Sequence, residues 1–137
     1  YGHVYVAKIA FGANDTHTLK VLQEAEKFDG PSLIIAYSHC IAHGYNLKSG
    51  IHQHKLAIDS GHWHLFRFNP DDEAGLTLDS NEPKKSLSEF MNTESRFKML
   101  SMVDSKRAEE LAVLAQRESV KKFELYKYMS KMNKKSE

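Results

Sequence analysis

The sequence predicts an α/β protein that is built around a parallel βαβ unit and ends in a long helix. Two strand-like apolar runs near the start of the chain flank a helix-like segment, and the last third carries apolar residues at helical spacing. A crossover of that length joins parallel strands, whose faces must be covered by helices. The 137 residues suit one domain or part of one, and a hydrophobic content of 41% is that of a globular chain.

The first strand is predicted over residues 4–11, which are rich in β-branched and aromatic side chains and stop at Gly12. Asn14 or Asp15 can then cap a helix, because their side chains accept hydrogen bonds from the free N–H groups of a first turn. Residues 29–31, Asp-Gly-Pro, end that helix, since glycine allows a left-handed cap and proline cannot continue.

The second strand is predicted over residues 32–37. Its unbroken apolar run favours a strand that is buried on both faces. Ligands of parallel sheets bind beyond the carboxyl ends of the strands. Residues 38–44, Ser-His-Cys-Ile-Ala-His-Gly, follow directly and form the most informative loop of the sequence.

Further along, a helix is predicted over residues 52–60 and a third strand over residues 64–70, closed by proline. The acids, glycine and proline of residues 71–85 indicate an irregular segment.

The rest of the chain is predicted to be helical. Ser86 and Glu89 form a capping-box pattern, which starts a short helix. A second amphipathic piece covers residues 96–103, and a long helix runs from Asp104 onward. Its apolar stripe is expected to pack on the core and comprises Ala108, Leu111, Ala112, Ala115, Phe123, Tyr126 and Met129.

Composition excludes several classes of protein. Nineteen basic against eighteen acidic residues leave a net charge of +1, which gives no overall attraction to nucleic acid or to an anionic membrane. No apolar run reaches the length of a membrane-spanning helix, and a single cysteine rules out an internal disulfide. A cytoplasmic location is therefore expected. The start at Tyr1, without an initiator methionine, predicts a processed or excised piece.

Cys40 is the first candidate for chemistry. A lone cysteine is most often a small buried hydrophobe. Here it follows a predicted strand and lies between His39 and His43, with Gly44 permitting a sharp turn. A thiolate in that position can be a nucleophile or a metal ligand, although one cysteine cannot hold an iron–sulfur cluster alone.

Histidines offer an alternative, a free-standing module that binds zinc or a protein partner through the Cys40/His loop. All eight imidazoles lie at or before His64, and two pairs have the spacing His-x-His, at 52/54 and 62/64. Together with Cys40 they contain enough donors for a tetrahedral zinc site, but the spacing matches no standard zinc finger. The chain also contains no nucleotide-binding glycine loop and no serine-hydrolase elbow.

Ordered motifs along the chain resemble the C-terminal part of the pyruvate:ferredoxin (flavodoxin) oxidoreductase family. The resemblance extends from Tyr1 to about residue 130. Its most specific segments are Tyr-Gly-His-Val-Tyr-Val-Ala at 1–7, Gly-Pro-Ser-Leu-Ile-Ile-Ala-Tyr at 30–37, Cys-Ile-Ala-His-Gly at 40–44, Leu-x-Arg-x-Asn-Pro at 65–70 and Leu-Asp-Ser-x-Glu-Pro at 78–83.

The resemblance implies a thiamine-diphosphate and Mg²⁺ enzyme that oxidatively decarboxylates pyruvate with coenzyme A. The implied products are acetyl-CoA, CO2 and reduced ferredoxin or flavodoxin, with electrons passing through [4Fe–4S] clusters. The family's cysteine in this loop ligates the cluster nearest the thiamine, and Cys40 is expected to do the same. Residues 1–103 would then be the C-terminal part of an α/β domain of the thiamine-diphosphate-binding type, and residues 104–137 a helical extension.

The chain also departs from the family. The other cluster cysteines and the Gly-Asp-Gly motif that holds the diphosphate and Mg²⁺ lie upstream in the family and are absent here. The isolated chain is therefore expected to be inactive and to bind neither thiamine nor a complete cluster. Its implied partner is the remainder of the same polypeptide, in an enzyme expected to be a homodimer.

Overall fold

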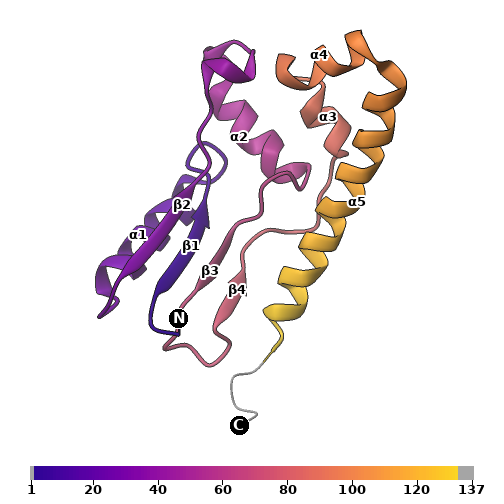
Figure 1. Cartoon of the computed structure of the whole chain (residues 1–137). Coiled ribbons are helices and arrows are strands. Elements are labelled where there is room, and N and C mark those ends of the chain that lie inside the picture. The colour runs from indigo at the N-terminus through magenta and orange to yellow at the C-terminus, as the bar shows by residue number, and fades with distance from the viewer. Residues whose placement is uncertain (1, 133–137) are drawn as a thin grey trace.

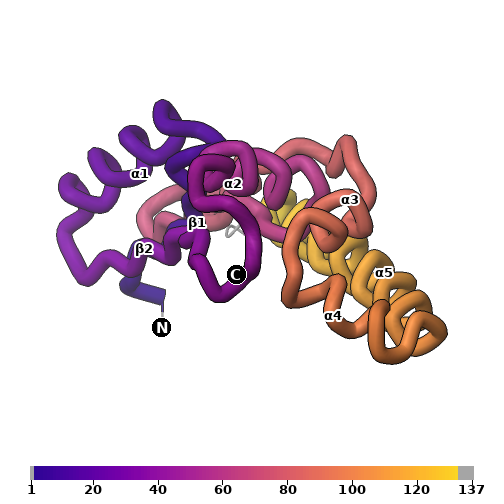
Figure 2. Tube along the Cα trace, turned by 90° about the horizontal axis from the view of Figure 1, so that it is seen from above, coloured from indigo at the N-terminus to yellow at the C-terminus, as the bar shows by residue number. Residues whose placement is uncertain are grey.

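The computed structural model of the protein describes residues 2–132. Four strands form one sheet in the order β2-β1-β3-β4. Helices α1 and α5 lie on opposite sides of this sheet, and α2, α3 and α4 gather beyond the carboxyl ends of β1 and β2 (Figures 1 and 2). The bounds are β1 (Tyr5–Ile9), α1 (Asp15–Lys27), β2 (Ser32–Ala36), α2 (Gly50–Asp59), β3 (Phe66–Phe68), β4 (Leu76–Leu78), α3 (Leu87–Met91), α4 (Ser95–Val103) and α5 (Ser105–Met129).

The predicted βαβ unit is confirmed. Strands β1 and β2 pair in parallel, in a register that runs from Tyr5 opposite Ser32 to Ile9 opposite Ala36. The Asn14 side chain caps α1 by accepting a hydrogen bond from the His17 N–H group at 2.9 Å. The α/β class and the long final helix are confirmed with it.

The remaining strands run the other way, so the sheet is mixed. Strand β3 pairs antiparallel with β1, and β4 pairs antiparallel with β3. The prediction of an irregular segment over residues 71–85 was wrong in part, because β4 lies within it. Only three residues form β4, and Gly75 precedes them with φ of 66°, so the strand pattern is too short to be seen in the sequence.

Strand β2 is not buried on both faces, contrary to the prediction. The side chains of Leu33 and Ile35 are 52% and 39% exposed. The reason lies in the topology: β2 is an edge strand whose one strand neighbour among residues 2–132 is β1, and α1 covers one of its faces. The outer edge of β2 pairs with no other strand among residues 2–132, and most of its side chains are apolar. Such an edge is a common site of pairing with another chain or segment.

Two apolar cores hold these layers together. The first lies between the sheet and α1. Every second side chain of β1 points toward α1, and these residues, Tyr5, Ala7 and Ile9, pack with Val21. The second lies at the carboxyl end of the strands, beneath α2 and α3. It comprises Ala10, Tyr37, Leu56, Ala57, Leu65, Leu87 and Phe90.

Helices α3 and α5, in the second half of the chain, begin at the predicted residues. Ser86 and Glu89 form the predicted capping box at the start of α3. Asp104 caps α5 by accepting a hydrogen bond from the Arg107 N–H group at 2.9 Å. The predicted stripe of α5 faces the core along most of its length, but Met129 is 39% exposed. Residues 133–137, which belong to the predicted extension, lie outside the described part of the chain.

Within residues 2–132, no helix combines the length and the apolarity that crossing a bilayer requires.

Candidate functional site

The Cys40 loop, residues 38–44, leaves the carboxyl end of β2 at the end of the molecule where α2 and α4 lie (Figure 1). Cys40 has an extended backbone and an exposed thiol, and it immediately precedes a 3-10 turn over Ile41–His43. The His43 N–H group donates to the Cys40 carbonyl at 3.0 Å. Gly44 closes the turn with φ of 74°, a conformation that glycine adopts without strain, as the sequence predicted.

A chain of hydrogen bonds holds the loop on its His39 side. The Gly12 N–H group donates to His54 Nδ1 at 3.3 Å, and His54 Nε2 lies 2.8 Å from His39 Nδ1. Because His54 Nδ1 accepts, its proton is on Nε2, which donates to His39. Burial and the neighbouring His39 both lower the pKa of His54, which favours this neutral form. His39 is thus oriented by a residue of α2.

On its other side, the loop is held by residues that sequence analysis missed. Ser95, the first residue of α4, donates from its N–H group and its Oγ to the Gly44 carbonyl at 3.3 and 2.6 Å. The neighbouring Glu94 is fully buried, with Oε1 3.7 Å from His43 Nδ1. The Glu-Ser-Arg sequence at 94–96 matches no binding motif, so tertiary structure alone reveals its proximity to Cys40.

The zinc alternative finds no support in this arrangement. No group of three or more His, Cys, Asp or Glu side chains among residues 2–132 is placed to hold a metal ion. His54 points to His39, whereas His52 is exposed on α2. His62 stacks on Phe90 with ring centroids 4.2 Å apart and meets the Tyr37 ring edge-on, so its ring packs against residues of the apolar core.

His64 is also a core residue, 1% exposed and packed against the rings of Phe123 and Tyr126 on α5. Its Nε2 is buried with no hydrogen-bond partner in the described part of the chain. Burial lowers the pKa of His64 to about 4, and the charges of Lys8 on β1 and Lys122 on α5 act in the same direction. His64 is therefore neutral in the folded chain.

The neutral state of His64 predicts a loss of stability in mild acid. Between pH 6.5 and 4 the unfolded chain binds a proton that the folded chain excludes, so the free energy of unfolding falls as pH decreases, by up to about 1.4 kcal/mol per unit. Urea unfolding at several pH values measures this slope. His64→Leu is expected to make it shallower, and the exposed His52→Gln is expected to leave it unchanged. Equal slopes in His64→Leu and the parent chain would contradict the assignment.

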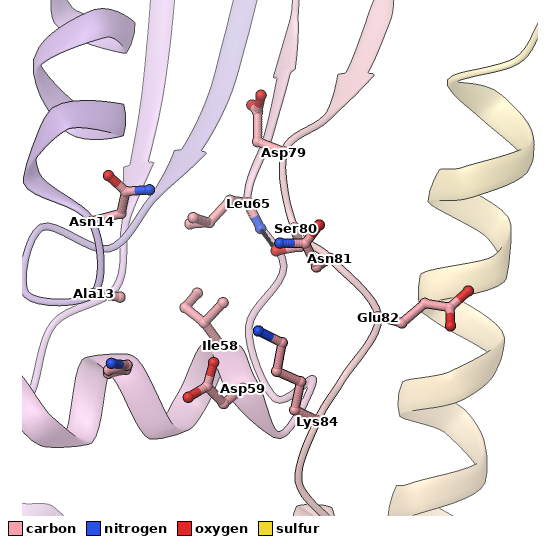
Figure 3. A pocket seen from close by; sticks show the side chains of 11 residues that line it. Ala13, Asn14, Ile58, Asp59, Leu65, Asp79, Ser80, Asn81, Glu82 and Lys84 are labelled. Atoms are coloured by element: carbon pink, nitrogen blue, oxygen red, sulfur yellow. Dashed lines mark hydrogen bonds between the residues drawn. The ribbon is translucent and has the colours of Figure 1, made fainter.

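A polar cavity of about 130 Å³ lies apart from the Cys40 loop, between the start of α1, α2 and the segment after β4 (Figure 3). Two of its acids are neutralised by partners: Asp79 accepts two hydrogen bonds from Arg67, and Glu82 accepts one from Lys127. Burial raises the pKa of Asp79, but hydrogen bonds from His17 and Arg67 outweigh it and lower the pKa to about 2. Asp79 is thus part of a partly buried ion-pair network, and Glu82 is paired on the surface, so neither acid is left without a partner for a ligand to neutralise.

The Cys40 loop fits a metal cluster as the source of one ligand. Four thiolates commonly hold a [4Fe–4S] cluster, and this chain contains one cysteine. The thiol is exposed, and the backbone around it is anchored from both sides, as a ligand shared with another segment requires. A cluster at this loop would therefore take one ligand from this chain and the others from elsewhere.

The chain is similar over most of its length to large pyruvate oxidoreductases. It is 48% identical over 134 residues to a pyruvate-flavodoxin oxidoreductase of Trichormus variabilis, a match that covers 95% of this chain and 11% of that relative. A protein of the same name from Rhodospirillum rubrum is 51% identical over 109 residues, or 77% of this chain and 9% of the relative. The pyruvate:ferredoxin oxidoreductase of Moorella thermoacetica is 39% identical over 134 residues, again 95% and 11%.

No established protein-family profile matches the chain. It spans about 11% of the length of the curated relatives from Trichormus and Moorella. These matches cover 77% to 95% of the chain at 39% to 51% identity. The chain therefore corresponds in sequence to one short segment of pyruvate-flavodoxin and pyruvate:ferredoxin oxidoreductases.

Proposed function

We propose that the chain is a segment of an enzyme that oxidatively decarboxylates pyruvate with coenzyme A to acetyl-CoA and CO2 and reduces ferredoxin or flavodoxin. The observation that carries this proposal is the match over 95% of the chain to relatives named for pyruvate and for those electron acceptors. Residues 1–103 would form the C-terminal part of the α/β domain of the thiamine-diphosphate-binding type, followed by the helical extension of residues 104–137.

Within that enzyme, Cys40 would supply one thiolate to a [4Fe–4S] cluster whose other ligands come from the remainder of the polypeptide. Such a cluster, when bound, carries single electrons from the oxidised substrate toward the acceptor. The exposed thiol supports this role, because a ligand must reach a group that lies outside its own segment. His39 and Gly44, held by His54 and Ser95, would fix the direction of that thiol.

Thiamine diphosphate, Mg²⁺, pyruvate and coenzyme A would be bound largely by residues outside this chain. No diphosphate-binding Gly-Asp-Gly motif occurs in the 137 residues. The isolated segment would accordingly have no activity. Assembly with the rest of the polypeptide would cover the exposed Leu33 and Ile35 of β2, in a cytoplasmic homodimer.

The test is Cys40→Ser in the full-length protein, purified without oxygen. Four thiolates hold a [4Fe–4S] cluster, and the variant removes one of them. We therefore expect it to lose one of several [4Fe–4S] signals in its EPR spectrum and to contain about four fewer iron atoms per chain. Pyruvate oxidation with a ferredoxin acceptor should slow in parallel. Ser38→Ala, an exposed change two residues away, serves as the matched control and should retain every cluster.

Unchanged iron and an unchanged spectrum in Cys40→Ser would return Cys40 to a structural thiol. Stoichiometric zinc on the 137-residue chain, lost in the same variant, would favour the free-standing module instead.

A further inference from the structure

Glu94 lies just before α4 and is the most completely buried acid near the Cys40 loop, with 0% of its surface exposed. Gln53 of α2 donates to its Oε1 at 2.9 Å, and Arg96 donates to its Oε2. His43 Nδ1 lies 3.7 Å from Oε1. A buried carboxylate is costly unless it is paired, and this one is stabilised by hydrogen bonds from Gln53 and Arg96.

Several buried polar groups around Glu94 have no hydrogen-bond partner among residues 2–132. These groups are the Tyr37 hydroxyl, the Tyr45 hydroxyl and His43 Nδ1. Burial raises the pKa of both tyrosines, and the Glu94 charge raises them further, so both hydroxyls lie within reach of its field. Unsatisfied buried polar groups are rare, and several around one carboxylate indicate a role beyond stability.

This cluster is connected to Cys40 through the backbone. His43 donates its N–H to the Cys40 carbonyl, and Gly44 is held by Ser95, the residue after Glu94. Tyr45 follows Gly44 directly, and its ring lies against that of His43, with ring centroids 6.3 Å apart. The start of α4 therefore anchors Gly44, the residue that follows the turn after Cys40.

We propose that Glu94 is a positioning residue for the group that Cys40 ligates: its carboxylate lies 3.7 Å from His43 Nδ1, the next residue, Ser95, anchors Gly44, and together they fix the turn after Cys40 and place a buried carboxylate next to it. The inference rests on the proposed function, in which Cys40 is a cluster ligand. A reduced cluster carries one more negative charge than an oxidised one, so a nearby carboxylate opposes reduction.

The experiment compares redox titrations of the full-length protein, monitored by EPR, in the parent and in Glu94→Gln. We expect every cluster to be retained, while the one that depends on Cys40 shifts its midpoint potential to more positive values and changes its line shape. His43→Gln breaks the same contact from the loop side, and its side chain is 20% exposed, so it tests the proposal even if Glu94→Gln fails to fold. The shift of the double variant should be smaller than the sum of the single shifts.

Glu110→Gln is the matched control, because that carboxylate is half exposed on α5 and paired with Arg107. It should leave the potential and the spectrum unchanged. If Glu94→Gln and His43→Gln both match the parent in potential and line shape, Glu94 is structural only and the inference is overturned. That result leaves the role proposed for Cys40 intact, whereas retention of every cluster in Cys40→Ser removes Cys40 from the cluster and with it the premise of this inference.

Discussion

Replacing Phe90 with alanine is expected to lower the free energy of unfolding by about 3–5 kcal/mol, the usual cost of removing a large aromatic side chain from a packed core. Phe90 is 0% exposed and stacks on His62, with 22° between the ring planes. Phe97 of α4 meets its edge, with ring centroids 6.2 Å apart. The residual cavity would loosen the packing of α3 beneath α2 and α4.

Urea unfolding of the chain, followed by circular dichroism, measures this change. With a typical urea dependence of about 1–3 kcal/mol per molar, the midpoint should fall by at least about 1 M. Phe11→Ala is the matched control, since that ring is 62% exposed and its loss should cost well under 1 kcal/mol. Equal midpoints for the two variants would show that Phe90 is not a core anchor.

The second large effect is expected at Arg67, whose guanidinium joins two elements that are distant in sequence. It donates to both oxygens of Asp79 at 2.8 and 2.9 Å, and to Glu24 of α1 at 2.7 Å. Its side chain is 14% exposed, as is that of Asp79. Hydrogen bonds to Asp79 raise the pKa of Arg67, and the guanidinium remains charged at every relevant pH.

Arg67→Met should therefore cost about 3 kcal/mol, because it leaves the partly buried Asp79 with the His17 hydrogen bond but without a cationic partner among residues 2–132, and it weakens the contact between α1 and the sheet. Arg67→Lys should lose less, since it keeps the charge but not the two-pronged contact. Arg107→Met removes an exposed pair with Glu110 and should change stability by less than about 1 kcal/mol. Urea midpoints compare all three, and similar losses at Arg67 and Arg107 would refute the role given to the buried network.

The local signals of the sequence were sufficient for most elements. The first strand and the helix cap depend on interactions between near neighbours along the chain. The strand predicted over residues 4–11 is found as Tyr5–Ile9, and of the two predicted caps, Asn14 and Asp15, Asn14 is the one used. The capping box at Ser86 and the helix start at Asp104 are similar cases. The position of Cys40 beyond a parallel strand also followed from the sequence, because a crossover of that length fixes the direction of β2.

Tertiary structure decided what no local pattern encodes. The edge position of β2 depends on which strands pair, so an apolar run that predicts burial leaves Leu33 exposed. Strand β4 is stabilised by its pairing with β3. Its three residues are too few to show the alternation by which a strand is predicted from sequence.

The surroundings of Cys40 show the same division. The sequence placed the thiol at the end of a strand and flanked it with histidines. Folding then separated His64 from the loop and brought Glu94 to it from more than fifty residues away in sequence. Contacts between distant segments are set by the packing of whole elements. The sequence near Cys40 therefore determines where the thiol lies in its segment, and the fold determines which residues hold that segment.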